Sequence, residues 1–241
     1  MGAEMAGETV KSEAICLSVR PWSRTSHVIS WLTPSGRVAT LVKGAVRPKS
    51  AFLGQYDLNY TCEIVYYSRA RGEVHALREC FPLKMREALR SDYKALALAG
   101  YFRLLAERFA PQGDDALAWF KELSAALDFS CGGVNGPGAA AMLLLFFEIK
   151  VLALLGLRPE VESAAGSFAL RGERTMPVSG DVAELVGSLS VLTRPPSVAD
   201  DFPIPLDALR VIGVYYSLHL DLPPDVRRSV LGIVSKTVER G

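Results

Sequence analysis

Motifs for catalysis and metal binding are missing from this sequence. No two of the four cysteines are close enough to form a Cys-x-x-Cys metal knuckle or redox pair. The three histidines have no cysteine or carboxylate at ligand or triad spacing, and no Gly-x-x-x-x-Gly-Lys-Ser/Thr loop occurs. These absences argue against a hydrolase or a nucleotide-hydrolysing enzyme. We expect a protein without catalytic activity whose cysteines are small apolar core residues.

We expect neither a targeting segment nor a membrane segment in this sequence. The first eight residues lack the basic and apolar run of a signal peptide. The most apolar stretch, Ala139–Leu157, contains Glu148 and Lys150 near its middle, and charges are costly in hydrocarbon. We therefore interpret it as a buried helix of a cytoplasmic protein that does not contact a membrane.

Acidic residues are absent from one long stretch, which runs from Ala14 to Tyr56. Six basic residues lie in it: Arg20, Arg24, Arg37, Lys43, Arg47 and Lys49. The formal net charge of the whole chain is only +1, so this concentration is hidden in the total. A patch of one charge sign raises the local potential and attracts polyanions. The pattern predicts that the N-terminal third binds a nucleic-acid backbone.

The first eighty residues have the pattern of short β-strands separated by turns. In Asn59–Tyr67, apolar or aromatic residues recur at every second position, which is the period of a half-buried strand. The five expected strands are Glu13–Val19, His27–Leu32, Arg37–Lys43, Asn59–Tyr67 and Glu73–Glu79. Five short antiparallel strands in this length predict a small closed barrel of the OB-fold type.

After Pro82 the apolar residues follow a helical period. Expected helices cover the region from Tyr93 to Pro111, the region from Asp114 to Leu127, Ala139–Leu155, Leu206–Leu220 and Asp225–Glu239. The fold class predicted is α+β with two domains. Residues 1–80 form an OB-fold nucleic-acid-binding domain, and residues 81–241 form an all-α domain with a small irregular subdomain at about 158–180.

The main candidate site residues are Lys43, Arg47 and Lys49. They flank Gly44 and Pro48 at the end of an expected strand. Lysine binds a phosphate through a compact positive charge, and arginine binds it through two parallel N–H donors. A glycine lets the protein backbone approach the phosphate closely. The alternative is a charged loop that only contacts solvent.

Four further arginines are candidates for DNA phosphates. Arg24 and Arg37 belong to the acid-free stretch, although either could instead pair with an acid of the helical domain. Arg227 and Arg228 lie near the start of the last expected helix, where the alternative is a solvated helix face.

Aromatic residues lie among the basic ones, and OB-folds commonly hold single strands by stacking bases on aromatics. Trp22 stands in a loop-like Arg-Pro-Trp-Ser segment and is a candidate for stacking or for packing. Trp31 stands inside an expected strand, where core packing is favoured.

The order of several motifs resembles the RecO family of bacterial recombination mediators. The family pattern of Gly-Arg, an apolar strand, Lys-Gly-Ala-Arg and a Pro-Lys-Ser tail is similar to Gly36–Ser50. Four more segments resemble family motifs in the right order: Arg20–Ser26, Gly72–Glu79, Phe147-Glu148 and Leu154–Gly156. Together they span about 130 residues.

This resemblance implies an N-terminal OB-fold, a helical domain and a function without catalysis. Proteins of the family bind single- and double-stranded DNA and anneal complementary strands. Their implied partners are RecR and the acidic tail of single-stranded-DNA-binding protein, and they help to load RecA.

The sequence departs from the family at several positions. Many relatives bind zinc through two Cys-x-x-Cys pairs after the Leu-Leu-Gly helix, but the stretch from Pro159 to Ser167 has no cysteine. A closed zinc site needs four thiolates or imidazoles, so we expect no zinc and no other cofactor. Leu145 and Phe146 stand where some relatives have an arginine, which weakens one expected contact to the acidic tail. Arg24 replaces a common glutamate and makes the patch more basic.

A second hypothesis remains open. The OB-fold could be a protein-interaction adaptor whose basic patch binds an acidic peptide tail rather than DNA. Binding of single-stranded DNA by the basic barrel would favour the first hypothesis.

Overall fold

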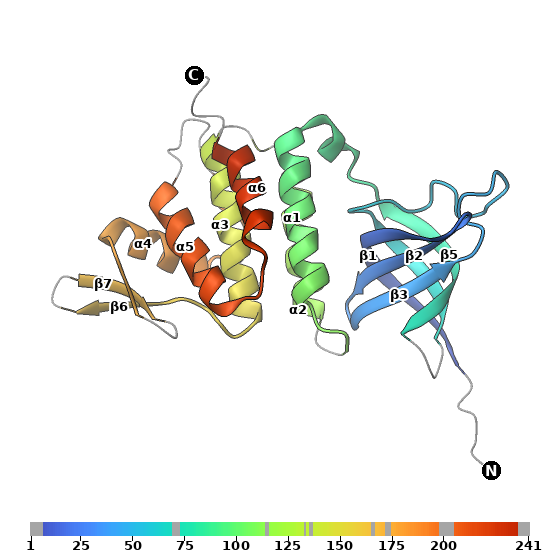
Figure 1. Ribbon diagram of the computed structural model, residues 1–241, viewed down its shortest axis with the longest axis horizontal. Helices are drawn as coiled ribbons and strands as arrows, with labels where there is room; N and C mark the ends of the chain where they lie inside the picture. Colours follow the sequence, from blue (N-terminus) through green and yellow to red (C-terminus); the bar gives the residue numbers. More distant parts are fainter. Residues whose placement is uncertain are drawn as a thin grey trace, which may run out of the picture. The chain divides into compact units, whose positions relative to one another are not determined.

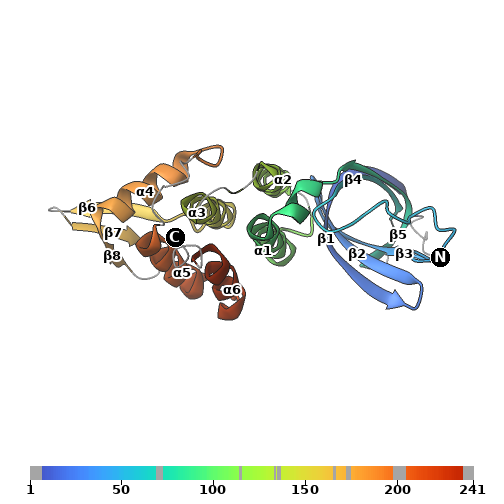
Figure 2. The same cartoon turned by 90° about the horizontal axis from the view of Figure 1, so that it is seen from above.

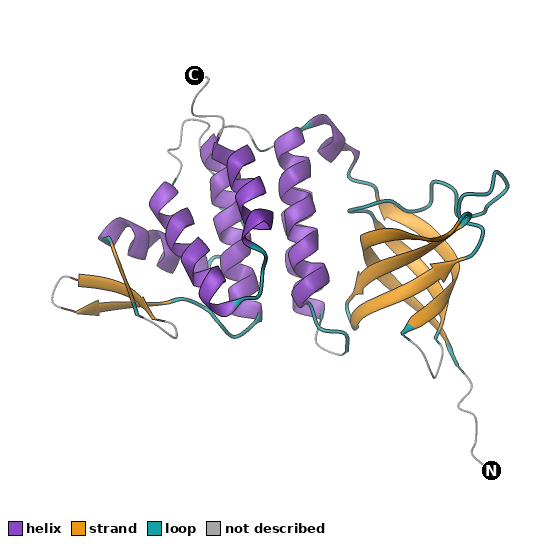
Figure 3. Cartoon of the chain, in the orientation of Figure 1, coloured by secondary structure: helices purple, strands orange, loops and turns teal. Residues whose placement is uncertain are grey.

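The computed structural model describes residues 7–68, 73–113, 116–132, 134, 137–164, 167–171, 175–197 and 205–235. The chain forms two compact units. One takes its described residues from 1–86 and 103–124, and the other from 87–102 and 125–241. The first is mostly β-structure and the second mostly helical, as the colouring of Figure 3 shows. The predicted fold class is confirmed.

A closed five-stranded barrel forms most of the first unit. Its strands are β1 (Thr9–Ser23), β2 (Ser26–Thr33), β3 (Gly36–Val42), β4 (Thr61–Tyr67) and β5 (Val74–Lys84). They follow the order β1-β2-β3-β5-β4 around the barrel, and the long β1 pairs with both β2 and β4 to close it (Figures 1 and 2). Neighbours are antiparallel except β3 and β5, which pair in parallel. All five predicted strands are present, and most extend beyond their predicted ends.

The barrel interior is filled by the alternating residues that the sequence pattern predicts. Cys62, Ile64 and Tyr66 of β4 are buried, while Glu63 and Val65 between them are partly exposed. Trp31 is fully buried and its indole Nε1 donates a hydrogen bond to Thr40 Oγ1 at 2.8 Å. Since a buried tryptophan needs a partner for its N–H, this bond lets the largest side chain lie in the core.

The cysteines are core residues, as predicted. Cys16, Cys62 and Cys80 are buried in the barrel, and Cys131 is partly buried. Burial raises the pKa of the Cys16 thiol. Because the thiolate is the reactive form, this cysteine is poorly suited to redox chemistry.

Helices and one small sheet form the second unit. The helices that lie wholly or partly in it are α1 (Tyr93–Phe109), α2 (Leu117–Cys131), α3 (Pro137–Leu154), α4 (Gly180–Val191), α5 (Leu206–His219) and α6 (Pro224–Ser235). A 3-10 turn, Glu87–Ser91, precedes α1. The apolar α3 is buried nearly all round and packs against α4, α5 and α6, as expected for a central helix (Figure 2).

The stretch predicted to be irregular contains regular structure. Three short antiparallel strands, β6 (Glu160–Ala164), β7 (Ser167–Arg171) and β8 (Met176–Val178), form a sheet in the order β6-β7-β8. Strands of three to five residues are too short to show a clear period, which explains why the pattern suggested no element. Helix α4 was also missed, although Ser179 caps its first turn by accepting a hydrogen bond from Val182 N.

No helix of the described residues is long and apolar enough to span a membrane. The predicted last helix is described as far as Ser235, and the rest of its predicted range lies outside the described residues.

Candidate nucleic-acid interface

Two loops meet at one end of the barrel and form a hollow. The tip of the β1–β2 hairpin contributes Trp22, Ser23 and Thr25, and the loop that follows β3 contributes further residues. Thr25 accepts a backbone hydrogen bond from Val46 N at 3.4 Å, which ties the two loops together. The hollow measures about 450 Å³, and its eight lining residues are Trp22, Ser23, Thr25, Ser26, Leu41, Lys43, Gly44 and Arg47. We call this the hairpin hollow.

The charge of the hairpin hollow has one sign. Lys43 and Arg47 are both exposed and line it, and none of the eight lining residues is acidic. Ser23, Thr25 and Ser26 add hydroxyl groups. A neighbouring pair of cations with hydroxyl groups is suited to an anionic ligand rich in hydrogen-bond acceptors, such as a phosphodiester.

Gly44 allows Arg47 to fold back over the hollow. Its φ is +68°, a value that glycine adopts without strain, and its N–H donates to Ser26 Oγ at 3.3 Å. Arg47 N donates to the Gly44 carbonyl at 3.1 Å and closes the turn. A Cβ at position 44 would lie 3.2 Å from Arg47 Cδ. The glycine predicted between the two basic residues thus has a specific geometric role.

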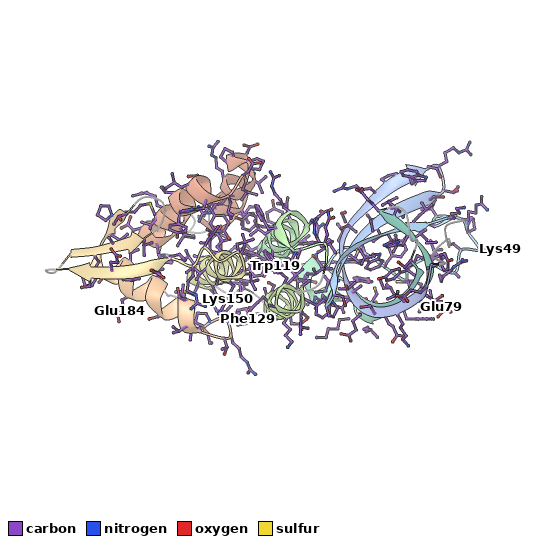
Figure 4. All side chains as sticks on the ribbon, turned by 90° about the horizontal axis from the view of Figure 1, so that it is seen from below. Lys49, Glu79, Trp119, Phe129, Lys150 and Glu184 are labelled. Carbon is purple, nitrogen blue, oxygen red and sulfur yellow. The ribbon has the colours of Figure 1, made fainter. Side chains whose placement is uncertain are left out.

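Lys49 and Arg24 lie near the hollow without lining it. Lys49 is exposed on the loop after β3, and Figure 4 shows its side chain outside the barrel wall. Arg24 is exposed in the turn between β1 and β2, next to Ser23. Both can extend a phosphate path that begins in the hollow.

Arg37 does not belong to this surface. It stands at the opposite end of β3 from Lys43, a separation of about 20 Å along the strand. Its Nε donates to the Ala110 carbonyl at 2.6 Å, and its Nη1 donates to the Glu107 carbonyl. Burial lowers its pKa. Arg37 therefore holds the barrel to the helical segment after residue 102, and its assignment to a DNA site is not supported by its surroundings.

The two arginines near the C-terminal helix differ from each other. Arg227 is 8% exposed and forms a double hydrogen bond to the Glu148 carboxylate, from Nε to Oε1 at 2.7 Å and from Nη2 to Oε2 at 2.8 Å. Arg228, its neighbour, is exposed. Both possibilities weighed for Arg227 in the sequence, a phosphate contact and a solvated face, are contradicted by this burial.

The aromatic candidates separate clearly. Trp22 is 67% exposed beside the two cations, whereas Trp31 is fully buried. Tyr56 packs edge-on against Trp31, and its hydroxyl lies 2.8 Å from His27 Nδ1. Burial raises the pKa of Tyr56 to about 12, with a smaller effect from Cys16 and Cys80. Of these aromatic residues, only Trp22 is both exposed and part of the hollow's lining.

The sequence pattern did not single out the hydroxyl residues of the hairpin. The break between the two apolar strand segments could have predicted a tight hairpin turn at these residues. A two-residue turn places Ser23 opposite Ser26, so their hydroxyl groups lie close to the turn. No group of three or more His, Cys, Asp or Glu side chains suited to a metal ion occurs within the described residues.

Comparison with known proteins agrees with this architecture. The family description "Recombination protein O N terminal" matches residues 5–86, and "Recombination protein O C terminal" matches residues 90–194. A protein of Rhodopirellula baltica named DNA repair protein RecO is 31% identical over 67% of this chain and 59% of its own length. Proteins of the same name from Desulforudis audaxviator and a Roseiflexus species are 31% and 26% identical over 66% and 73% of the chain, and 61% of their own lengths.

The matched region thus spans about three-fifths of the length of these curated relatives. Two adjoining family descriptions cover most of the chain, and the first coincides with the five-stranded barrel. The chain belongs to the RecO family.

Proposed function

We propose that this chain is a non-enzymatic, cytoplasmic recombination mediator in DNA repair, which binds single- and double-stranded DNA and anneals complementary strands. The observation that carries the proposal is the hairpin hollow. It combines Lys43, Arg47 and an exposed Trp22 on the end of an OB-type barrel, and its lining contains no acid. OB-folds hold single strands with this combination of charge and aromatic surface.

Annealing follows from charge neutralisation. Two DNA strands repel each other through their phosphates, and each bound cation releases condensed counterions and lowers that repulsion. A surface that contacts phosphates rather than base edges leaves the pairing edges free. A strand held in this way can still pair with its complement and can be passed on to RecA.

Salt dependence tests the phosphate contacts. The affinity of the chain for a labelled single-stranded oligonucleotide should fall as salt rises, with a log–log slope of about −0.7 per neutralised phosphate. In the Lys43→Ala/Arg47→Ala double variant the slope should become shallower by about 1.4, and affinity near 0.1 M salt should fall roughly 25-fold. Fluorescence anisotropy over a range of sodium chloride concentrations gives both values.

Arg37→Ala is the matched control, since it removes a cation from the other end of the same strand. It should leave the slope and affinity unchanged in samples that circular dichroism shows to be folded. Parent-like binding by the double variant would contradict the site, and an acidic peptide that displaces the oligonucleotide from the hollow would favour the adaptor hypothesis.

We propose RecR and the acidic tail of single-stranded-DNA-binding protein as protein partners. The helical unit offers the tail a groove of about 870 Å³ between α5 and α6. Its wall includes the exposed apolar residues Leu206, Val214 and Leu218. The exposed charged residues of the lining are Arg210, Arg228 and one acid, Asp221. This combination is complementary to a peptide that carries both acidic and apolar residues.

Reversing the charge at Arg228 tests the groove. The Arg228→Glu variant should bind a labelled peptide of the acidic tail about tenfold more weakly, because an attractive charge becomes a repulsive one. Arg158→Glu changes an exposed arginine outside the groove and should bind like the parent. Equal loss in the two variants would indicate attraction to net charge and would remove the groove as the docking site.

The three-stranded sheet β6-β7-β8 is proposed to need no zinc. Its strands pair along their whole length, and Leu170 of β7 is fully buried. We accordingly propose that the protein works without a metal or cofactor.

A further inference from the structure

We infer that the hairpin hollow seats one unpaired base of a single strand, stacked on Trp22, with the adjoining phosphates on Lys43 and Arg47. The inference rests on the proposed DNA-binding function and deepens it, because it makes Trp22 the residue that distinguishes a single strand from a duplex. It starts from the position of an exposed tryptophan in a charged hollow.

The exposure of Trp22 is unusual for a residue of this size. It is 67% exposed, while the chain's other two tryptophans, Trp31 and Trp119, are 0% and 3% exposed. Burying an aromatic side chain of this kind stabilises a protein or complex by about 2–3 kcal/mol. In the free chain most of this burial free energy of Trp22 is not realised. A ligand with a flat apolar face can recover it.

The surroundings of Trp22 select the ligand class. Lys43 and Arg47 line the same hollow and favour an anionic ligand. Ser23 and Thr25 contribute hydroxyl groups that can form hydrogen bonds with it. A volume of about 450 Å³ lies within the range of small-molecule sites, roughly 300–1,000 Å³. A nucleotide unit satisfies all of these features, since it joins a flat base to a charged phosphodiester.

Duplex DNA cannot use Trp22 in the same way. Its bases are covered on both faces by their neighbours, and exposing one costs unstacking and unpairing. Its phosphates can still reach Lys43 and Arg47. The two cations should therefore serve both kinds of DNA, whereas the indole serves unpaired strands.

Three oligonucleotide probes separate these contributions: a 20-nucleotide thymidine strand, an abasic strand of the same length and a 20-base-pair duplex. In the full chain, Trp22→Ala should weaken binding of the thymidine strand by about 5- to 150-fold, the range of one lost base stack. Its affinity for the abasic strand and the duplex should change less than twofold. Trp22→Phe keeps an aromatic face and should restore most of the loss.

Intrinsic fluorescence gives a second readout. Because Trp31 and Trp119 are buried, the thymidine strand should quench the emission of Trp22, and the abasic strand should not. In the Trp22→Phe variant this quenching should disappear while binding persists.

Two outcomes for Trp22→Ala would overturn the stacking role. One is an equal loss of affinity for the thymidine strand, the abasic strand and the duplex, and the other is unchanged affinity for the thymidine strand. Failure of the parent chain to bind any of the three probes would instead overturn the proposed function itself.

Discussion

Replacement of Arg227 by alanine should lower the free energy of unfolding of the helical unit by about 3–5 kcal/mol, the usual cost of leaving one buried charge without its partner. Glu148 is fully buried on α3 and would keep its carboxylate in an apolar interior. For a chain of this length the melting temperature should fall by about 10 °C. Far-UV circular dichroism during thermal or urea unfolding measures the change.

The size of this effect follows from how many groups share the carboxylate. Oε1 of Glu148 accepts from Tyr101 at 2.8 Å as well as from Arg227, and Arg227 Nη2 also donates to the Leu209 carbonyl at 2.9 Å. Tyr216 donates to the Glu148 backbone carbonyl at 2.9 Å. The network therefore joins α1, α3, α5 and α6 around one charge.

Burial next to Glu148 raises the pKa of both Tyr101 and Tyr216 well above the ordinary value, with desolvation as the largest cause. Both hydroxyls remain protonated and donating at neutral pH. Truncation of Arg227 leaves the carboxylate with Tyr101 as a neutral donor, which cannot replace the lost charge.

Arg228→Ala is the matched control, because it removes the same side chain one residue later from an exposed position. Its effect should stay within about 0.5 kcal/mol. The Glu148→Ala/Arg227→Ala double variant should be less destabilised than the sum of the two single variants, since neither charge is then left unpaired. Additive losses would show that the pair contributes packing rather than charge compensation.

These neighbouring arginines show where sequence reasoning stops. The period of the last helix was visible in the sequence, and its predicted start at Asp225 lies one residue from the observed start at Pro224. Two adjacent arginines look alike in a sequence, however, and the partner of Arg227 lies 79 residues away on another helix. Only the packing of α6 against α3 decides which arginine is buried.

The barrel was more predictable than its site. The alternation in the strand before Tyr67 is a local signal, and in the structure this segment forms part of the barrel wall. The acid-free stretch is also a local signal, and in the structure it contains the loop that carries Lys43 and Arg47. Arg37 and Lys43 fall within one predicted strand, so the sequence suggested a single basic patch. The length of β3 separates them, because a strand extends about 3.3 Å per residue and its two ends face different neighbours.

Replacement of Gly36 by alanine is the second change with a large expected effect, a loss of about 3 kcal/mol in the free energy of unfolding of the barrel unit. Gly36 begins β3 with a φ of +145°, and residues other than glycine adopt such backbone conformations at a cost of about 1–3 kcal/mol. An added Cβ would also lie 2.8 Å from the Gly113 carbonyl oxygen. The backbone would have to shift where Arg37 N donates to the Pro111 carbonyl at 2.9 Å.

Gly54→Ala isolates the contact from the backbone strain. Gly54 has a φ of +76°, and a Cβ there would meet nothing within 4 Å, so only about 1 kcal/mol should be lost. Emission from the buried Trp31 and Trp119 reports unfolding of this unit, because both belong to it.

Equal losses of unfolding free energy in the two glycine variants would show that the backbone around Gly113 moves aside at little cost. The hairpin hollow lies at the opposite end of β3 from Gly36. Folded Gly36→Ala protein should therefore bind single-stranded DNA like the parent. This result would separate an effect on the contact with the segment around Gly113 from an effect on the DNA site.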